Sequence, residues 1–81
     1  MRVTVRLFAR LRDLAGATDL DRELPDGATA LALWDGLTAE FPEFEPYKAT
    51  VSVAVNEEYA RMDAALADGD DIAFLPPVSG G

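Results

Sequence analysis

The residues that could do chemistry stand at the end of the sequence, where residues 74–81 read FLPPVSGG. Pro76 and Pro77 commit the backbone to an extended exit, because proline fixes its own φ and restricts the residue before it. Gly80 and Gly81 have no Cβ, so they can thread a channel too narrow for any other residue. The α-carboxylate of Gly81 becomes an acyl electrophile once ATP adenylates it, and a sulfur or amine nucleophile can then attack it. The alternative interpretation is an idle, frayed chain end.

Two residue types that often carry out catalysis are missing, because the 81 residues include no cysteine and no histidine. No disulfide, thiolate metal site or cysteine nucleophile can therefore form. Histidine is the usual general base near neutral pH and the commonest metal ligand, so a Ser-His-Asp triad is excluded. We expect no catalysis by this chain on its own, and no bound metal.

Charge is unevenly distributed along the chain, whose formal net charge is −8 at pH 7. Residues 1–24 hold five basic and four acidic groups, whereas residues 25–81 hold two basic and eleven acidic groups. This composition argues against nucleic acid as a partner, because phosphates need a lysine and arginine footprint. It favours a basic protein partner, although acidity that serves only solubility explains the composition equally well.

The length and the apolar pattern indicate one small domain outside the membrane. No apolar stretch approaches the ~20 residues of a membrane span. The first residues, MRVTVRLF, alternate at once and lack the apolar block of a secretory signal. We expect a cytoplasmic protein with no membrane partner.

The elements that would position the chain end follow from hydrophobic periodicity. Four alternating stretches predict strands at residues 2–8, 20–24, 51–55 and 71–75. A helix is predicted to begin after Thr29 and to end before Pro42. Its apolar stripe consists of Leu31, Trp34, Leu37 and Phe41. We expect residues 9–18 to be a loop or short turn, residues 42–50 an irregular connection, and residues 25–27, 56–59 and 68–69 turns.

One amphipathic helix packed across one mixed sheet is the simplest two-layer arrangement of these elements. With hairpins at both ends, the first and last strands can lie side by side in parallel at the centre of the sheet. The prediction is an α+β fold of the β-grasp, ubiquitin-like type. Residues 1–77 would form the domain, and residues 78–81 a flexible Gly-Gly tail.

Two apolar residues depart from the inside–outside pattern. Phe8 is out of phase with the core positions of the first strand, and Leu75 is out of phase with those of the last strand. If the two strands are parallel neighbours, Phe8 and Leu75 meet beside the root of the tail, where Tyr59 could join them. Such a cluster would be the centre of a docking patch, whereas scattered exposed apolar residues would need no explanation.

The motifs also resemble a known family. FLPPVSGG is similar to the C-terminal signature of the small, sulfur-carrying subunit of molybdopterin synthase, the MoaD family, which is related to the thiamine-pathway carrier ThiS and to ubiquitin. LFARLRDLAG near the start, VAVNEEYA and LADGDDIAFLPP are similar as well, so the resemblance covers essentially the whole chain.

The resemblance implies a sulfur carrier in molybdenum cofactor biosynthesis that is a non-catalytic subunit of the synthase. An adenylyltransferase of the ubiquitin-activating type would use ATP to adenylate Gly81, and a sulfur donor protein would convert it to a thiocarboxylate. Within a heterotetramer with the large subunit, this sulfur would pass to a pterin precursor. The residues expected to bind the channel are Pro77, Val78, Ser79 and Gly80. The residues expected to contact the large subunit are Phe8, Tyr59 and Leu75.

Three alternatives stay open. A carrier for thiamine or another sulfur pathway would use the same tail chemistry with a different acceptor, although the Pro-Pro favours the molybdopterin branch. A ubiquitin-like modifier would end in an isopeptide bond to a lysine of its target. A passive interaction domain would use its sheet and leave the tail idle.

Overall fold

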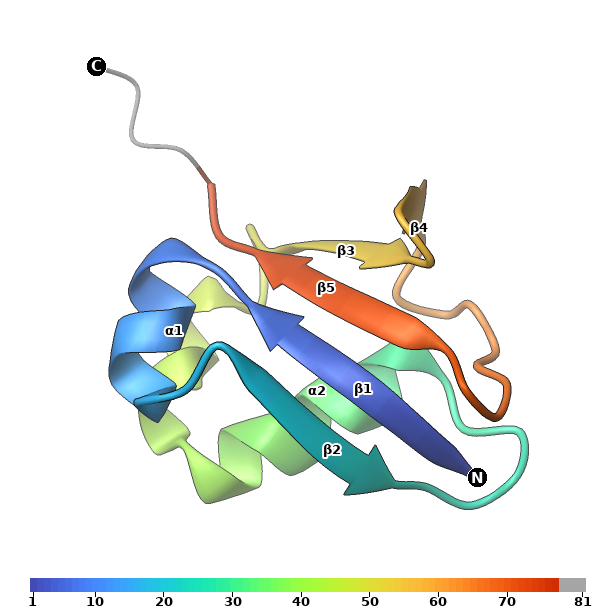
Figure 1. Ribbon diagram of the computed structural model, residues 1–81. Helices are drawn as coiled ribbons and strands as arrows, with labels where there is room; N and C mark the ends of the chain where they lie inside the picture. The colour runs from blue at the N-terminus through green and yellow to red at the C-terminus, as the bar shows by residue number, and fades with distance from the viewer. Residues whose placement is uncertain (78–81) are drawn as a thin grey trace.

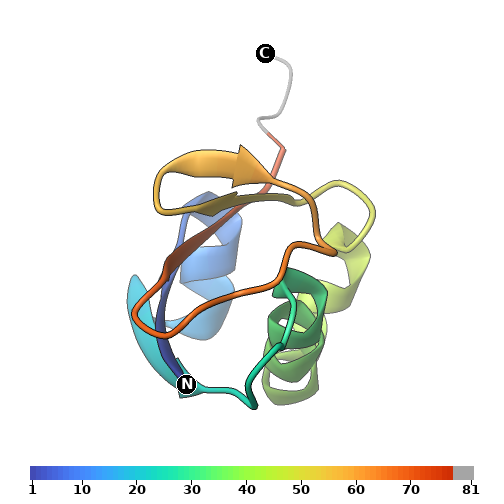
Figure 2. The ribbon, with the colours of Figure 1, turned by 90° about the vertical axis from the view of Figure 1, so that its right-hand side faces the viewer.

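The computed structural model describes residues 1–77, which form a five-stranded mixed sheet with helices on one face (Figures 1 and 2). Along the chain the strands are β1 (Arg2–Leu7), β2 (Asp19–Glu23), β3 (Ser52–Val55), β4 (Glu58–Ala60) and β5 (Asp71–Leu75). The helices are α1 (Ala9–Ala15), α2 (Ala30–Glu40) and the 3-10 helix η1 (Pro42–Tyr47). The tail predicted for residues 78–81 lies outside the described residues.

The strand order is β2-β1-β5-β3-β4. β1 and β5 are parallel, with Val5 opposite Ile72, and all other neighbours are antiparallel. This confirms the predicted parallel pairing of the first and last strands. It places β5, which leads to the chain end, in the middle of the sheet.

Helix α2 packs across the sheet as the sequence predicts, but the face that it buries differs in part from the predicted apolar stripe. Thr29 is its N-cap and accepts a hydrogen bond from the amide of Ala32 at 3.2 Å. The buried residues of α2 are Ala30, Leu33, Trp34 and Leu37. Leu31, predicted to be in the stripe, is instead 36% exposed. Residues 30–34 are all apolar, so more than one helical stripe was possible, and packing against the sheet selected this one.

Three local predictions were wrong. Residues 9–18 contain helix α1, which buries Leu11 and ends at Gly16 in the left-handed region (φ 71°). That glycine is a helix C-cap as well as a turn residue. Residues 42–47 form a 3-10 helix, which buries Phe44. Tyr59 lies in the short strand β4, because the turn before it needs only residues 56 and 57.

Within residues 1–77, the longest α-helix has 11 residues, and no helix has the length and apolar character needed to cross a bilayer. In the same residues, no group of three or more histidine, cysteine or carboxylate side chains is arranged to hold a metal ion.

Candidate functional site

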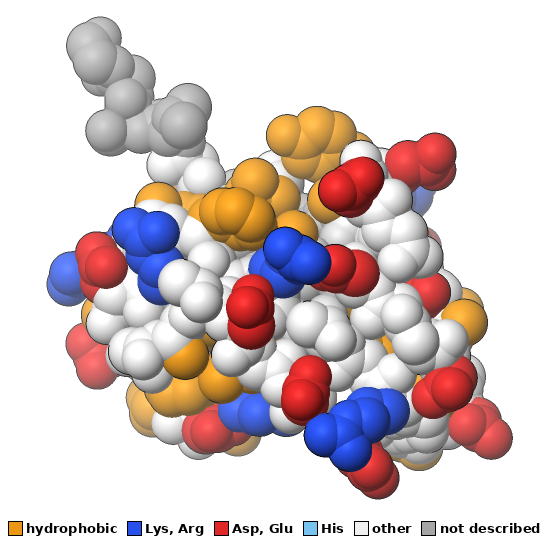
Figure 3. Space-filling view, in the orientation of Figure 1, with side chains coloured by type: hydrophobic (Ala, Val, Ile, Leu, Met, Phe, Trp, Pro, Cys, Tyr) orange, Lys and Arg blue, Asp and Glu red, His pale blue; other side chains and the backbone are white. Residues whose placement is uncertain are grey.

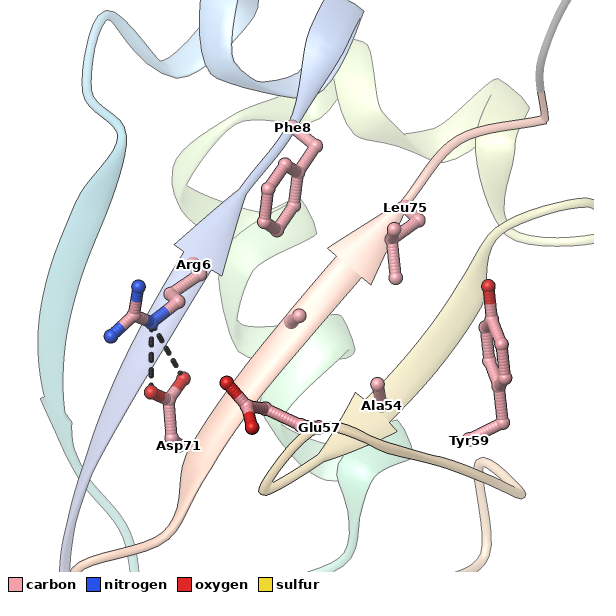
Figure 4. Close-up of a pocket in the computed structure, with 8 residues that line it drawn as sticks. Arg6, Phe8, Ala54, Glu57, Tyr59, Asp71 and Leu75 are labelled. Atoms are coloured by element: carbon pink, nitrogen blue, oxygen red, sulfur yellow. Dashed lines mark hydrogen bonds and ion pairs between the residues drawn. The ribbon is translucent and has the colours of Figure 1, made fainter.

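The three apolar residues singled out in the sequence lie around one hollow on the face of the sheet away from α2 (Figures 3 and 4). Phe8 is 42% exposed and follows β1, Tyr59 is 80% exposed on β4, and Leu75 ends β5. The hollow has a volume of about 290 Å³. Figure 3 shows hydrophobic side chains gathered on this face near the end of β5. The tertiary structure thus brings together residues that are up to 67 positions apart.

The register of the strands explains the floor of the hollow. Ala54 on β3 lies opposite Tyr59 on one side and opposite Ala73 on the other. Ala73 in turn lies beside Arg6 on β1. These four residues form a row across four strands, with the smallest side chains in the middle. Two adjacent alanines leave a depression between larger neighbours.

The alternation of side chains along β1 and β5 places Phe8 and Leu75 on the face of the sheet away from the core. Leu7 and Phe74 are buried, so the residues that follow them leave the core phase. Phe8 is extended (φ −125°, ψ 152°), and the next residue, Ala9, has φ 51°. This abrupt change of backbone direction starts α1 and leaves the Phe8 ring over the sheet facing Leu75 (Figure 4).

The other end of the hollow is charged. The Nε of Arg6 donates hydrogen bonds to both carboxylate oxygens of Asp71, at 3.0 and 2.8 Å. Glu57, from the turn between β3 and β4, also lines this end. The surface is therefore apolar beside Phe8 and Leu75 and ionic beside Asp71.

Sequence reasoning did not select the charged end or the alanine floor. The sequence did contain a pattern that points to these residues. Asp71 and Ala73 are four and two positions before Leu75, and Arg6 is two positions before Phe8, so each is expected on the same face of its strand. Extending that pattern along each strand would have found these residues. Glu57 had no such signal, since it lies in a turn.

The chain leaves the sheet next to this surface. Leu75 is followed by Pro76 and Pro77, and Pro77 is exposed. Pro77 is thus placed beyond the end of β5, close in sequence to the apolar wall, while its channel-binding role stays a prediction. The other predicted tail residues, Val78, Ser79, Gly80 and Gly81, lie outside the described residues.

The topology and the position of this surface define the class of protein. A mixed sheet with parallel first and last strands and a helix across one face is the β-grasp fold of ubiquitin-like proteins. The model of the ThiS family matches residues 5–81, and the chain belongs to that family.

Relatives and solved structures of similar size support this assignment. The chain is 40% identical to the molybdopterin synthase sulfur carrier subunit of Arabidopsis thaliana over 98% of its own length and 82% of that protein. It is 39% identical to the protein of the same name from Chlamydomonas reinhardtii, with all of both chains covered.

Solved structures of other proteins share the fold. The first is the putative molybdopterin converting factor subunit 1 of Pyrococcus furiosus (TM-score 0.85, 35% identity, 96% of this chain and 99% of that chain). The second is the small archaeal modifier protein 1 of Haloferax volcanii (TM-score 0.84, 29% identity, 95% and 98%). The third is one chain of the complex of subunits 1 and 2 of the molybdopterin-converting factor from Helicobacter pylori (TM-score 0.69, 26% identity, 100% of this chain and 100% of that chain).

Proposed function

We propose that this protein is the sulfur carrier subunit of molybdopterin synthase and that its sheet face docks on the large subunit. The observation that carries the proposal is the apolar surface of Phe8, Tyr59 and Leu75 beside the exit toward Gly80 and Gly81. A large apolar group exposed next to a narrow, glycine-ended segment suits a protein that docks by its body and inserts its end. The relatives named as sulfur carrier subunits, and the subunit complex from Helicobacter pylori, support this choice.

In this proposal, the chain supplies a carboxylate and a docking surface, and partners supply the catalysis. An activating enzyme uses ATP to convert the Gly81 carboxylate to an acyl adenylate, with release of pyrophosphate. Sulfur supplied by a donor protein at the oxidation level of sulfide then displaces AMP at the acyl carbon, which leaves a thiocarboxylate. The thiocarboxylate gives its sulfur to the pterin precursor in the large subunit, and water restores the carboxylate. These partners meet in the cytoplasm.

The decisive measurement is the mass of the protein purified from its own cells. The carrier role predicts a fraction heavier by the replacement of one oxygen atom with sulfur at Gly81. Deletion of Gly81 should abolish sulfur transfer in a reconstituted synthase while circular dichroism shows an unchanged fold, since the described domain ends before it. Full activity of the truncated protein would end the carrier proposal.

A second candidate is a ubiquitin-like modifier, favoured by the likeness to the small archaeal modifier protein 1. Activation of Gly81 would be shared, but the product would be an isopeptide bond to a lysine of a target. Mass spectrometry of cell extracts separates the two, because a modifier leaves Gly81 attached to other proteins. A carrier for thiamine or another sulfur pathway would be loaded in the same way and would fail to restore the synthase.

A further inference from the structure

The charged end of the hollow holds one negative charge that no ion pair among residues 1–77 balances. Arg6, Glu57 and Asp71 line this end, and Arg6 is engaged by Asp71 through two hydrogen bonds. Within residues 1–77, no cationic group lies within ion-pair distance of the Glu57 carboxylate. Figure 4 shows this carboxylate reaching over β5 toward the Arg6–Asp71 pair. Glu57 therefore adds an unpaired carboxylate to an otherwise apolar or balanced surface.

The backbone at Glu57 adopts a conformation that is unfavourable for its residue type. Asn56 and Glu57 have φ values of 52° and 71° and form the two-residue turn between β3 and β4. Such turns require positive φ at both residues, and the second position favours glycine. Asparagine tolerates this region, whereas a glutamate is disfavoured there. A glycine would fit the turn better but would offer no carboxylate to the hollow.

Asn56 holds this turn against the start of β5. Its backbone N–H donates to the carbonyl oxygen of Asp71 at 2.7 Å, and its side-chain oxygen accepts from the Asp71 N–H at 3.0 Å. Its side-chain amide donates to Asp70 at 3.0 Å. Three hydrogen bonds from one residue keep the turn beside the hollow, and Glu57 with it.

We propose that Glu57 is a specificity-determining residue of the docking surface and that it binds a lysine or arginine side chain of the large subunit. This cation lies next to an apolar side chain that the large subunit seats between Phe8, Tyr59 and Leu75. The inference rests on the function proposed above. A wholly apolar partner would cover Glu57 and leave its charge buried without a counter-ion, which is unfavourable. A basic group satisfies the carboxylate and matches the acidic character of the chain.

The test is a calorimetric titration of the full chain with the molybdopterin synthase large subunit of the same organism. Glu57→Gln keeps the size of the side chain and removes its charge, and should raise the Kd about tenfold, as expected for a charged hydrogen-bonded contact in an interface. Raising the NaCl concentration should weaken binding of the wild-type protein more steeply than binding of the variant.

The adjacent residue offers a matched control. Glu58 is also exposed, but it precedes Tyr59 on β4 and does not line the hollow. Successive residues of a strand point to opposite faces, so Glu58 faces away from the surface that holds Tyr59. Glu58→Gln removes the same charge from the same hairpin and should leave the Kd unchanged.

A second variant separates binding from folding. Glu57→Gly suits the positive φ of the turn, so it should raise the thermal midpoint of unfolding while it weakens binding about as much as Glu57→Gln. A purely structural role for residue 57 would instead predict that the glycine variant binds at least as well as the wild-type protein.

The outcomes distinguish this inference from the proposed function. Wild-type binding with an unchanged Kd for Glu57→Gln, or an equal loss for Glu58→Gln, would overturn the role of Glu57 and leave the docking function standing. No binding of the wild-type protein to the large subunit would overturn both.

Discussion

The aromatic rings of Trp34 and Phe74 lie 5.1 Å apart between their centroids and meet at 57°. This contact joins helix α2 to strand β5, the strand whose opposite face carries Leu75 and Asp71 at the hollow. Phe44 also stacks on this indole, with the ring centroids 5.3 Å apart. All three rings are fully buried. The core thus packs against one face of the central strand, and the other face of that strand lines the hollow.

We predict that Phe74→Ala lowers the free energy of unfolding by about 3–5 kcal/mol, because it leaves a cavity beside Trp34. Tyr59→Ala is the control, since Tyr59 is a large aromatic residue that is 80% exposed. Its effect should stay within about 0.5 kcal/mol, as is usual for surface positions. Urea denaturation of the three proteins measures both values. Similar losses for the two variants would contradict the assignment of the core.

The same substitution at two glycines should change stability in opposite directions. Gly16 caps α1 with φ 71°, whereas Gly36 lies within α2. A Cβ added at either position meets nothing within 4 Å, so only backbone preference decides the outcome. Gly16→Ala should destabilise the protein by about 1 kcal/mol, and Gly36→Ala should stabilise it by up to about 1 kcal/mol. Thermal unfolding monitored by circular dichroism tests the opposite signs.

Phe8→Asp and Leu75→Asp should each weaken binding to the large subunit by about 2–4 kcal/mol, because each places a charge in the apolar centre of the interface. Leu31→Asp is the matched control. Leu31 is also an exposed large apolar residue, but it lies on α2 and does not line the hollow. Calorimetric titration should find normal affinity for the control. Normal affinity for Phe8→Asp would mean that this face is not the interface.

Gly80→Val should permit docking but prevent sulfur transfer. The reacting carboxyl group belongs to Gly81 and is chemically the same in this variant. A β-branched side chain one residue earlier widens the chain and excludes positive φ, so a channel shaped for bare backbone would reject it. Chemical loading of the variant with a thiocarboxylate bypasses the activating enzyme, and a single-turnover assay with the pterin precursor then measures transfer. Transfer at the wild-type rate would show that the synthase does not read the width of residue 80.

Much of the fold could be predicted because the strands follow a two-residue period. Val3, Val5 and Leu7 on β1, with Ile72 and Phe74 on β5, are buried as their alternation predicts. The same period implied that Phe8 and Leu75 leave the core, and the structure places them around one hollow. The strand faces of these residues could be predicted because alternation fixes the face on which each side chain lies, whereas their role in binding a partner stays a prediction.

The sequence by itself determined the strand faces, the turn at Gly69 and the start of α2 at Thr29, and the chemistry proposed for Gly81 also rests on the sequence alone. Only the tertiary structure decided which face of α2 is buried. Residues 30–34 are all apolar, so the sequence allows more than one buried face, and the packing of Trp34 in the core fixes how the helix is turned about its axis. It also decided that residues 9–15 are helical and that Glu57 lines the same hollow as Asp71. Period-two alternation is a local property, whereas these outcomes depend on which distant residues become neighbours when β5 enters the middle of the sheet.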